Sequence, residues 1–357
     1  MNKERITNVL SRLENADAVL VSDPMAIRYL CGEMIYPGER FLGLLLKRGQ
    51  DPVLFLNILF PMQEIEGLKI VSYADGDDLN ELLSSYISKD EVLGIDKTFQ
   101  ARFLLPMQKY GLAKDYVDGS LAVDKTRAVK EKEELELLRR SSQINDAAMA
   151  EFKKLIHEGV SEKQIASKCL DIYKRLGADG FSFSPIVAFG KNSANPHHMP
   201  DDTILQEGDA VLFDVGCTYR GYCSDMTRTF FYKKAPEGKR KEVYELVRKA
   251  NEEATEKVKA GVRLCDIDKT ARDIIIEGGY GRFFTHRLGH FIGLEDHEYG
   301  DVSAAFKDLC EIGNVFSIEP GIYDPDSLGC RIEDLVVVTE EGCEVLNSYP
   351  HDIEIIC

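Results

Sequence analysis

The segment FDVGCTYRGYCSDMTRTF, residues 213–230, constrains the fold most, because its apolar arms flank a turn and predict a buried β-hairpin. If the turn centres on Tyr219 and Arg220, Asp214 and Asp225 lie directly opposite each other, with Cβ atoms roughly 5 Å apart. Like charges at this separation are destabilising, and burying them unpaired costs still more. A shared proton, a basic residue or a metal cation would relieve the repulsion. The alternative is a hairpin end in water, with both carboxylates hydrated.

Length, charge and cysteine content exclude several classes of protein. The 357 residues favour two domains. A net charge of −17 argues against a nucleic-acid or anionic-membrane partner. The N-terminal segment has no long apolar core of a secretory signal, and no apolar run approaches the roughly 20 residues of a membrane helix. Nine cysteines without a CxxC pair indicate reduced thiols, so we expect a cytoplasmic protein.

The order of predicted elements divides the chain near Val123. Residues 1–120 alternate helices such as RITNVLSRLEN with strand-like segments such as DAVLVSDPMAIRYLCG and DPVLFLNI, which predicts an α/β domain. The remainder shows the order helix, helix, strand, strand twice, and this repetition suggests a pseudo-symmetric domain with a site between its halves. The helices are expected at about 131–157, from Ser161 to a stop at Gly177, at about 239–259, and in DIDKTARDIIIEGG.

Histidines and glutamates beside apolar stretches add to the two aspartates. THRLGHFIGLEDHE holds His286, His290 and His297, and the intervening glycines weaken a helical reading of the first pair. Glu319 ends an apolar run in FSIEPG, and Glu333 lies in the strand-like GCRIEDLVVV. A lone histidine is more often structural, and a single glutamate in a strand usually faces solvent. Together with the aspartates, however, they form a ligand set suited to two divalent ions such as Mn, Co, Fe or Zn.

These motifs, in this order, resemble the pita-bread metallopeptidases, in the branch of the Xaa-Pro aminopeptidases and Xaa-Pro dipeptidases (prolidases). ADAVLVSDPMAIRYLCG is similar to the start of the creatinase-type N-terminal domain of these enzymes. The resemblance implies an α/β (α+β) architecture. A creatinase-like domain would span residues 1–122, and a pseudo-symmetric pita-bread catalytic domain would span residues 123–357.

The resemblance also implies a role for each motif residue. Five match the ligands of two divalent metal ions, with manganese the first candidate and cobalt, zinc or iron the alternatives: Asp214, Asp225, His290, Glu319 and Glu333. Glu319 would also shuttle the proton of the attacking water, and His197 (favoured over His198 by its spacing to Asp214) and His297 would act as catalytic hydrogen-bond donors. His286 matches a position near the substrate, and Arg331 one beside the last glutamate ligand.

The implied activity is hydrolysis of the N-terminal Xaa-Pro bond of dipeptides or short peptides by a metal-bridging hydroxide, in a homodimer. Two departures from the family pattern, Phe291 in GHFIG and Gly300 in HEYG, put the substrate preference in doubt, and Phe291 is expected to alter the pocket wall. Dipeptidase and aminopeptidase activity are not separated by the sequence. The alternatives are a catalytically altered protein acting as a binding module, a creatinase-type hydrolase without metal, and a methionine aminopeptidase, which would not need the N-terminal domain.

Overall fold

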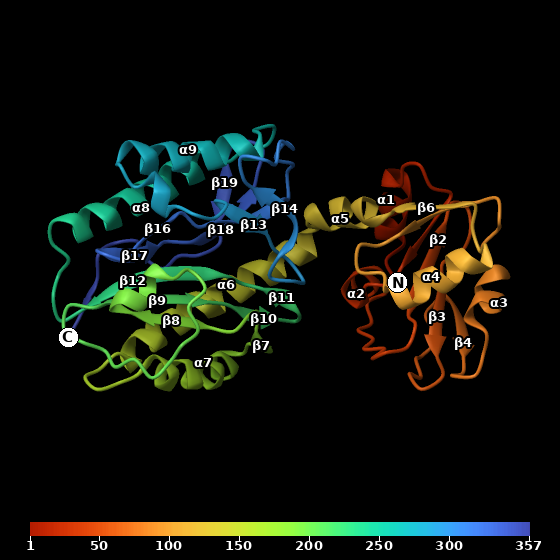
Figure 1. Cartoon of the computed structure of the whole chain (residues 1–357), viewed down its shortest axis with the longest axis horizontal. Helices are drawn as coiled ribbons and strands as arrows, with labels where there is room; N and C mark the ends of the chain where they lie inside the picture. Colours follow the sequence, from red (N-terminus) through yellow and green to blue (C-terminus); the bar gives the residue numbers. More distant parts are fainter. The chain divides into compact units, whose positions relative to one another are not determined.

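The computed structural model describes all of residues 1–357 and divides into two compact units, Met1–Arg127 and Ala128–Cys357. Figure 1 shows both units. The helix α5 (Ser120–Ala128) contains both this division and the expected boundary between residues 122 and 123. No helix combines the length and apolar character needed to cross a membrane.

The first unit is a mixed six-stranded sheet with helices, as the alternating pattern predicts. The strand order is β4-β3-β2-β1-β5-β6, with β1 antiparallel to β2 and parallel to β5. Apolar residues of β1, β2, β3 and β5 pack with α3 and α4 in one core, and α1 lies against β2. The bounds are α1 Lys3–Arg12, β1 Ala18–Val21, α2 Pro24–Cys31, β2 Gly43–Lys47, β3 Val53–Asn57, β4 Lys69–Tyr73, α3 Leu79–Ser84, β5 Val92–Ile95, α4 Ala101–Tyr110 and β6 Asp115–Asp118.

The segment DAVLVSDPMAIRYLCG is only partly the strand expected from its apolar content. The strand β1 ends at Val21, and α2 follows at once. Asp23 caps this helix by accepting a hydrogen bond from the backbone N–H of Met25, and Pro24 occupies the first turn. Gly32 ends the helix with a φ of 86°. The apolar content of this stretch is compatible with a strand or a helix. The capping residues at its start and end favour the helix.

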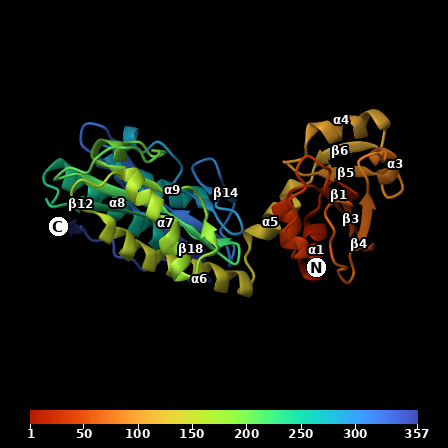
Figure 2. The ribbon, with the colours of Figure 1, turned by 90° about the horizontal axis from the view of Figure 1, so that it is seen from below.

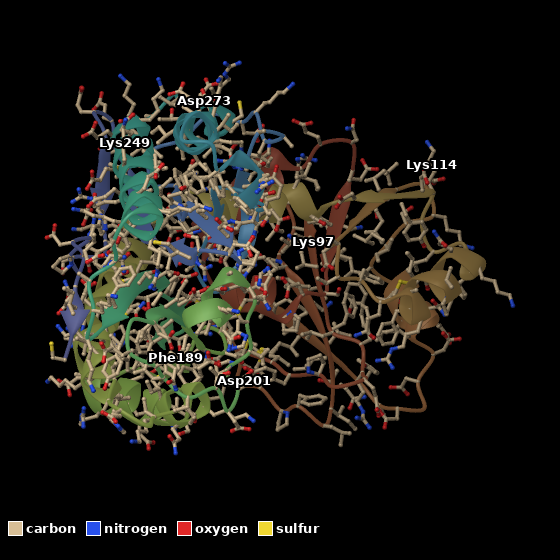
Figure 3. The ribbon with its side chains drawn as sticks, turned by 60° about the vertical axis from the view of Figure 1, so that its left-hand side comes forward. Lys97, Lys114, Phe189, Asp201, Lys249 and Asp273 are labelled. Carbon is tan, nitrogen blue, oxygen red and sulfur yellow. The ribbon has the colours of Figure 1, made fainter.

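The second unit contains two pairs of long helices that lie on opposite sides of its strands (Figures 1 and 2). The first pair is α6 (Lys132–Phe152) and α7 (Glu162–Leu176), and the second is α8 (Lys239–Lys257) and α9 (Leu264–Glu277). The predicted capping box of Ser161 with Gln164 is present, and Gly177 ends α7 as expected. On α8 and α9, Lys249 and Asp273 point away from the strands (Figure 3).

The strands of the second unit form separate small sheets between these helix pairs. One sheet has the order β20-β12-β9-β8 and shares a core with α6 and α7; another has the order β14-β13-β15-β18-β19 and shares a core with α8 and α9. The bounds are β7 Gly180–Phe181, β8 Ile186–Phe189, β9 Ala210–Val215, β10 Cys217–Tyr219, β11 Tyr222–Cys223, β12 Met226–Tyr232, β13 Gly289–Phe291, β14 Glu298–Val302, β15 Val315–Ile318, β16 Gly321–Asp324, β17 Leu328–Arg331, β18 Asp334–Val338, β19 Cys343–Val345 and β20 Ile355–Ile356.

The hairpin at 213–230 is present, but its predicted register is wrong. The turn centres on Arg220 and Gly221, whose φ values are 49° and 84°. A two-residue hairpin turn of type I′ needs positive φ at both central positions, and glycine adopts it without strain. The register therefore places Asp214 opposite Thr227 and not opposite Asp225. Asp225 precedes β12 and is the diagonal neighbour of Asp214, on the same face of the hairpin.

Candidate metal centre

The second unit contains a cavity of about 540 Å³ that gathers nine of the ten site residues predicted from the sequence. Its polar lining comes from both helix-and-strand repeats, and an apolar part is formed by Phe183, Ile186 and Pro196. The predicted residues in the lining are His197, Asp214, Asp225, His286, His290, His297, Glu319, Arg331 and Glu333. Phe291 is the exception.

Strand ends bring the five predicted ligands together. Asp214 lies near the end of β9, and Asp225 directly precedes β12 of the same sheet. His290 is the central residue of β13, in the other sheet. Glu319 follows β15, and Glu333 directly precedes β18. Because both sheets contribute, residues separated by more than a hundred positions share one site.

The centre of this group is closely packed and buried. Ligand atoms of Asp225, His290 and Glu333 all lie within 4.8 Å of one another. The His290 Nε2 is 3.6 Å from the Asp225 Oδ2 and 3.5 Å from the Glu319 Oε1. Its Nδ1 is 3.2 Å from the backbone oxygen of Phe291, which accounts for the orientation of Nε2 toward the carboxylates. The Thr227 hydroxyl fixes Glu333 through a 2.7 Å hydrogen bond to its Oε2.

Burial and mutual repulsion disfavour the ionised forms of the clustered carboxyl groups. Burial, and then repulsion from Glu333, raises the pKa of Asp225 well above its usual value. Burial and the charge of Glu319 do the same to the pKa of Glu333, and burial raises the pKa of Glu319 to about 8. Burial lowers the pKa of His290, so its imidazole is a neutral ligand. Cations among these groups would remove the repulsion.

An unsatisfied oxygen supports the fit of metal ions to this site. The Oδ1 of Asp225 is buried and has no hydrogen-bond partner, although buried polar atoms are nearly always paired. Several carboxylate oxygens with one imidazole nitrogen are ligands that suit Mn, Fe, Co or Zn. The residues present therefore fit divalent metal ions.

Arg331 connects the metal-facing carboxylates to the wall of the cavity. Its guanidinium donates to the Asp214 Oδ2, and to the Tyr323 hydroxyl at 2.7 Å. Although burial lowers the pKa of Arg331, Tyr323 and Asp214 together raise it well above its usual value. The same hydroxyl is 2.8 Å from the His286 Nε2. Sequence reasoning missed Tyr323, although its place in GIY, close after Glu319, was a usable signal.

The adjacent residues His197 and His198 have different surroundings. His197 lines the cavity, whereas His198 is buried with its Nε2 2.6 Å from the Glu162 Oε2. His297 also lines the cavity, with its ring centroid 3.9 Å from that of His290. Burial lowers the pKa of His297, which favours its neutral form.

Two charged residues of the cavity, Asp296 and Arg287, were not singled out from the sequence. Asp296 directly precedes His297, and burial followed by the charge of Asp214 raises its pKa to about 7. Arg287 forms an ion pair of 2.6 Å with Asp301. Their places in HRLGHFIGLEDHE, between and beside the predicted histidines, were the available signal.

Phe291 lies on the opposite face of β13 from His290, in the core and not in the cavity wall. Its ring packs against Phe316 at 5.4 Å, and its side chain is buried among apolar residues of the second helix pair. Gly300 lies beneath the ring: its φ is 118°, and a Cβ there would stand 2.5 Å from Phe291. The two departures from the family pattern, Phe291 and Gly300, therefore belong to one packing arrangement. The Phe291 ring packs over Gly300 of β14, near a β-bulge in β13.

Comparison with known proteins agrees with this arrangement. Residues 136–340 match the metallopeptidase family M24, and residues 4–129 match the creatinase/prolidase N-terminal domain. An uncharacterized peptidase of Staphylococcus epidermidis is 37% identical over 97% of this chain and 98% of its own length. A prolidase from Thermococcus sibiricus superposes with a TM-score of 0.91 at 32% identity, covering 99% of both chains. An X-Pro aminopeptidase from Thermotoga maritima superposes with a TM-score of 0.83 at 31% identity, covering 97% of this chain and 99% of its own.

The expected fold and family are confirmed by these matches, which extend over nearly the whole chain. The N-terminal unit is a creatinase/prolidase domain, and the C-terminal unit holds the buried carboxylate and histidine cluster. The chain belongs to metallopeptidase family M24, with the pita-bread fold of that family.

Proposed function

We propose that this chain hydrolyses the N-terminal Xaa-Pro bond of dipeptides or short peptides with two divalent metal ions. The ions would be held by Asp214, Asp225, His290, Glu319 and Glu333. The observation that carries the proposal is the convergence of four carboxylates and one neutral imidazole on a single cavity. The raised pKa values of Asp225, Glu319 and Glu333 indicate that added positive charge would stabilise their ionised forms. Manganese is the first candidate, and cobalt, zinc or iron are the alternatives.

Two divalent cations held by these residues would lower the pKa of a coordinated water and polarise the scissile carbonyl. Glu319 would receive the proton of the attacking water, the role that the family resemblance gives to this position. Its side chain lines the cavity and is 15% exposed, similar to Asp214 at 13% and more than Asp225 at 5%. The Ser317 hydroxyl donates to its Oε1 at 3.3 Å and orients it.

The cavity histidines can donate hydrogen bonds to the substrate. A neutral imidazole carries one N–H, and the lowered pKa of His297 keeps this form at neutral pH. His297 and His197 would direct such donors at the substrate carbonyl and at the charge that develops on its oxygen. His286, held by the Tyr323 hydroxyl, and Arg331 would keep the cavity wall in place.

Proline at the second position fits the chemistry of the cavity. The Xaa-Pro bond is a tertiary amide without N–H, so its recognition requires no acceptor for that group. The apolar side chains of Phe183, Ile186 and Pro196 offer a wall for the pyrrolidine ring. The similar solved structures include both prolidases and an X-Pro aminopeptidase, which supports the shared Xaa-Pro specificity and leaves chain-length preference to experiment.

A paired assay tests the proposal. The protein is stripped with chelator and reloaded with Mn²⁺ or Co²⁺, and hydrolysis of Ala-Pro and Ala-Pro-Ala is followed beside Ala-Ala-Ala. Cleavage of Ala-Pro alone indicates a dipeptidase, and cleavage of the tripeptide indicates an aminopeptidase. Silence on both proline peptides, with metal bound, contradicts the Xaa-Pro specificity. Failure to bind metal favours the binding module or the non-metal hydrolase instead.

The expected homodimer and the cytoplasmic location stay predictions of the family resemblance and of the composition. Light scattering of the purified full chain measures the first directly. A mass near 80 kDa, roughly twice the 40.2 kDa of one chain, would support the dimer.

A further inference from the structure

Glu162 is a buried carboxylate outside the cavity, and the proposed mechanism assigns it no role. It is the first residue of α7, and its side chain has no exposed area. The first turn of a helix favours a negative charge. A carboxylate without access to water nevertheless has to be compensated by hydrogen bonds or by a cation. The partners of Glu162 therefore show what its burial accomplishes.

All the side-chain partners of Glu162 lie in one segment, residues 189–201, which contains His197. Four donors surround its two oxygens: at Oε1 the backbone N–H of Phe189 (2.7 Å) and the amide of Asn192 (2.9 Å), and at Oε2 the His198 Nε2 (2.6 Å) and the backbone N–H of Asp201 (3.0 Å). A group that accepts from every side has the character of an ionised carboxylate, so the His198 Nε2 carries the proton. Because donors lie both before and after His197, one carboxylate fixes the chain on both sides of this residue.

His197 depends on this segment for its position. Its ring lines the cavity and forms no hydrogen bond within the chain, and its backbone N–H donates to the Asn195 Oδ1 of the same segment at 3.2 Å. Pro196 and Pro200 flank the two histidines and have a fixed φ, so the backbone between them has little freedom to compensate for a displaced anchor. The place of the ring in the cavity is therefore set by the contacts of residues 189–201.

A second anchor of the segment lies on β17. The Ser193 hydroxyl accepts the backbone N–H of Gly329 at 3.2 Å and donates to the Gly190 carbonyl at 2.7 Å. A Cβ at Gly329 would collide with the backbone of Ser193, so the two backbones are in direct contact. The strand β17 ends at Arg331, which donates to Asp214. The segment is thus fixed relative to the cavity wall through β17 and through Glu162.

We propose that Glu162 is the positioning residue of His197, and that its carboxylate holds the His197 ring where it meets the substrate carbonyl. The inference rests on the proposed peptidase function, because the carbonyl belongs to the scissile bond of that substrate. A hydrogen bond to developing charge depends steeply on geometry, and a displacement of about 1 Å costs on the order of 100-fold in rate. His198 then serves as a partner of Glu162, whereas its neighbour His197 contacts substrate.

A double-mutant cycle tests the proposal on whichever of Ala-Pro and Ala-Pro-Ala wild type cleaves faster. Metal-loaded wild type, Glu162→Gln, His197→Ala and the double variant are compared. Glutamine keeps the size of the side chain but places an NH₂ group where one oxygen faced two donors. We expect Glu162→Gln to lower kcat by about 10- to 100-fold and to change KM less than about threefold. In the His197→Ala background the same change should cost less than about threefold, because the ring it positions is absent.

Equal losses of kcat in both backgrounds would mean that Glu162 acts on the fold and not through His197, and would overturn the inference. Each variant should hold as much metal as wild type. Glu158→Gln makes the same change at a side chain that is 84% exposed and paired with Lys233, and should alter neither kcat nor KM.

Substitutions of His198 provide a second test that also holds if Glu162→Gln does not fold. His198→Leu removes one of the four donors, whereas His198→Gln keeps an N–H at the same distance along the side chain. We expect His198→Leu to lower kcat by about 10-fold and His198→Gln to recover most of the loss. Equal kcat for wild type and His198→Leu, or equal losses in the two variants, would contradict the role of the Glu162 hydrogen bonds.

NMR of ring-labelled histidines separates the inference from the proposed function. The chain has seven histidines, and the His197 signal is assigned by its absence from His197→Ala. In chelator-treated protein, Glu162→Gln should shift or broaden this signal and leave that of His286, which is held by the Tyr323 hydroxyl, in place. If wild type cleaves no proline peptide and the shift is seen, the peptidase proposal fails and the anchoring stands. If wild type cleaves the peptide and the His197 signal is unchanged in Glu162→Gln, the positioning role alone is refuted.

Discussion

Removal of metal should make the carboxyl cluster destabilise the protein as the pH rises, because the cluster then has to ionise without cations. In the metal-free state, burial raises the pKa of Glu319 from its ordinary 4.5 to about 8. A group with a raised folded pKa contributes its full stabilisation below the unfolded pKa and loses it as the pH passes through the folded value. The loss should therefore occur between about pH 4.5 and pH 8. Asp225 and Glu333 shift in the same direction.

The size of this effect follows from the shift. Each pKa unit corresponds to about 1.4 kcal/mol, so Glu319 alone contributes on the order of 3–5 kcal/mol over this range. For a domain of 150–250 residues, 1 kcal/mol moves Tm by roughly 2–4 °C. The cavity histidines His286, His290 and His297 have lowered pKa values and therefore add stability as the pH rises toward about 6.5. The contribution of Glu319 is isolated by comparing wild type with Glu319→Gln, in which the histidines are unchanged. We expect the Tm of metal-free wild type to fall by roughly 10 °C relative to that of Glu319→Gln between pH 5 and pH 8.

Differential scanning calorimetry with and without chelator measures the effect. Metal-loaded protein should show little of this fall, since the cations stabilise the ionised carboxylates. Glu319→Gln should reduce the slope of the metal-free protein, whereas Glu277→Gln, the same change at an exposed position, should not. If the metal-free Tm of wild type and of Glu319→Gln changed equally from pH 5 to pH 8, the raised pKa of Glu319 would be refuted.

Three further predictions follow from the same contacts. Arg331→Gln should lower the free energy of unfolding by about 3–5 kcal/mol, because it leaves Asp214 and the Tyr323 hydroxyl without their buried partner; denaturant unfolding measures this, and a loss below about 1 kcal/mol would contradict it. Gly300→Ala should destabilise the fold through its φ of 118° and its contact with Phe291, and adding Phe291→Ala should recover part of the loss; purely additive effects in thermal melts would argue against the packing described. Binding of Mn²⁺ should release protons, more at pH 6 than at pH 8.5, because carboxyls with raised pKa are protonated before the metal enters; calorimetry in buffers of different ionisation enthalpy counts them, and equal release at both values would count against the raised pKa values.

Local signals in the sequence predicted much of the second unit. Ser161 with Gln164 and the stop at Gly177 predicted α7 closely, because capping chemistry acts within one turn of the helix. The apolar arms predicted the hairpin correctly, but the predicted register was wrong. The turn type, and with it the partner of Asp214, depends on which residues adopt positive φ, and Gly221 decided it.

Other features of the site depend on tertiary placement that one sequence does not display. The spacing to Asp214 favoured His197 over His198, and the physical reason is tertiary: the buried Glu162 on α7 holds His198 away from the cavity. Phe291 follows His290 in β13 and therefore faces the other side of the strand, into the core. Asp296 lay beside a predicted histidine, but only burial and an unpaired oxygen distinguish it from a solvated surface charge.

The most direct test of the central claim is a metal titration of the chelator-treated protein, with the number of Mn²⁺ ions per chain read from calorimetry and confirmed by metal analysis. Wild type is expected to bind two ions per chain. Asp225→Asn should bind fewer or bind them far more weakly, and the control Asp202→Asn, at an exposed side chain paired with Lys163, should match wild type. A wild-type protein that binds no tight divalent ion, or an Asp225 variant that binds as wild type does, would contradict the account.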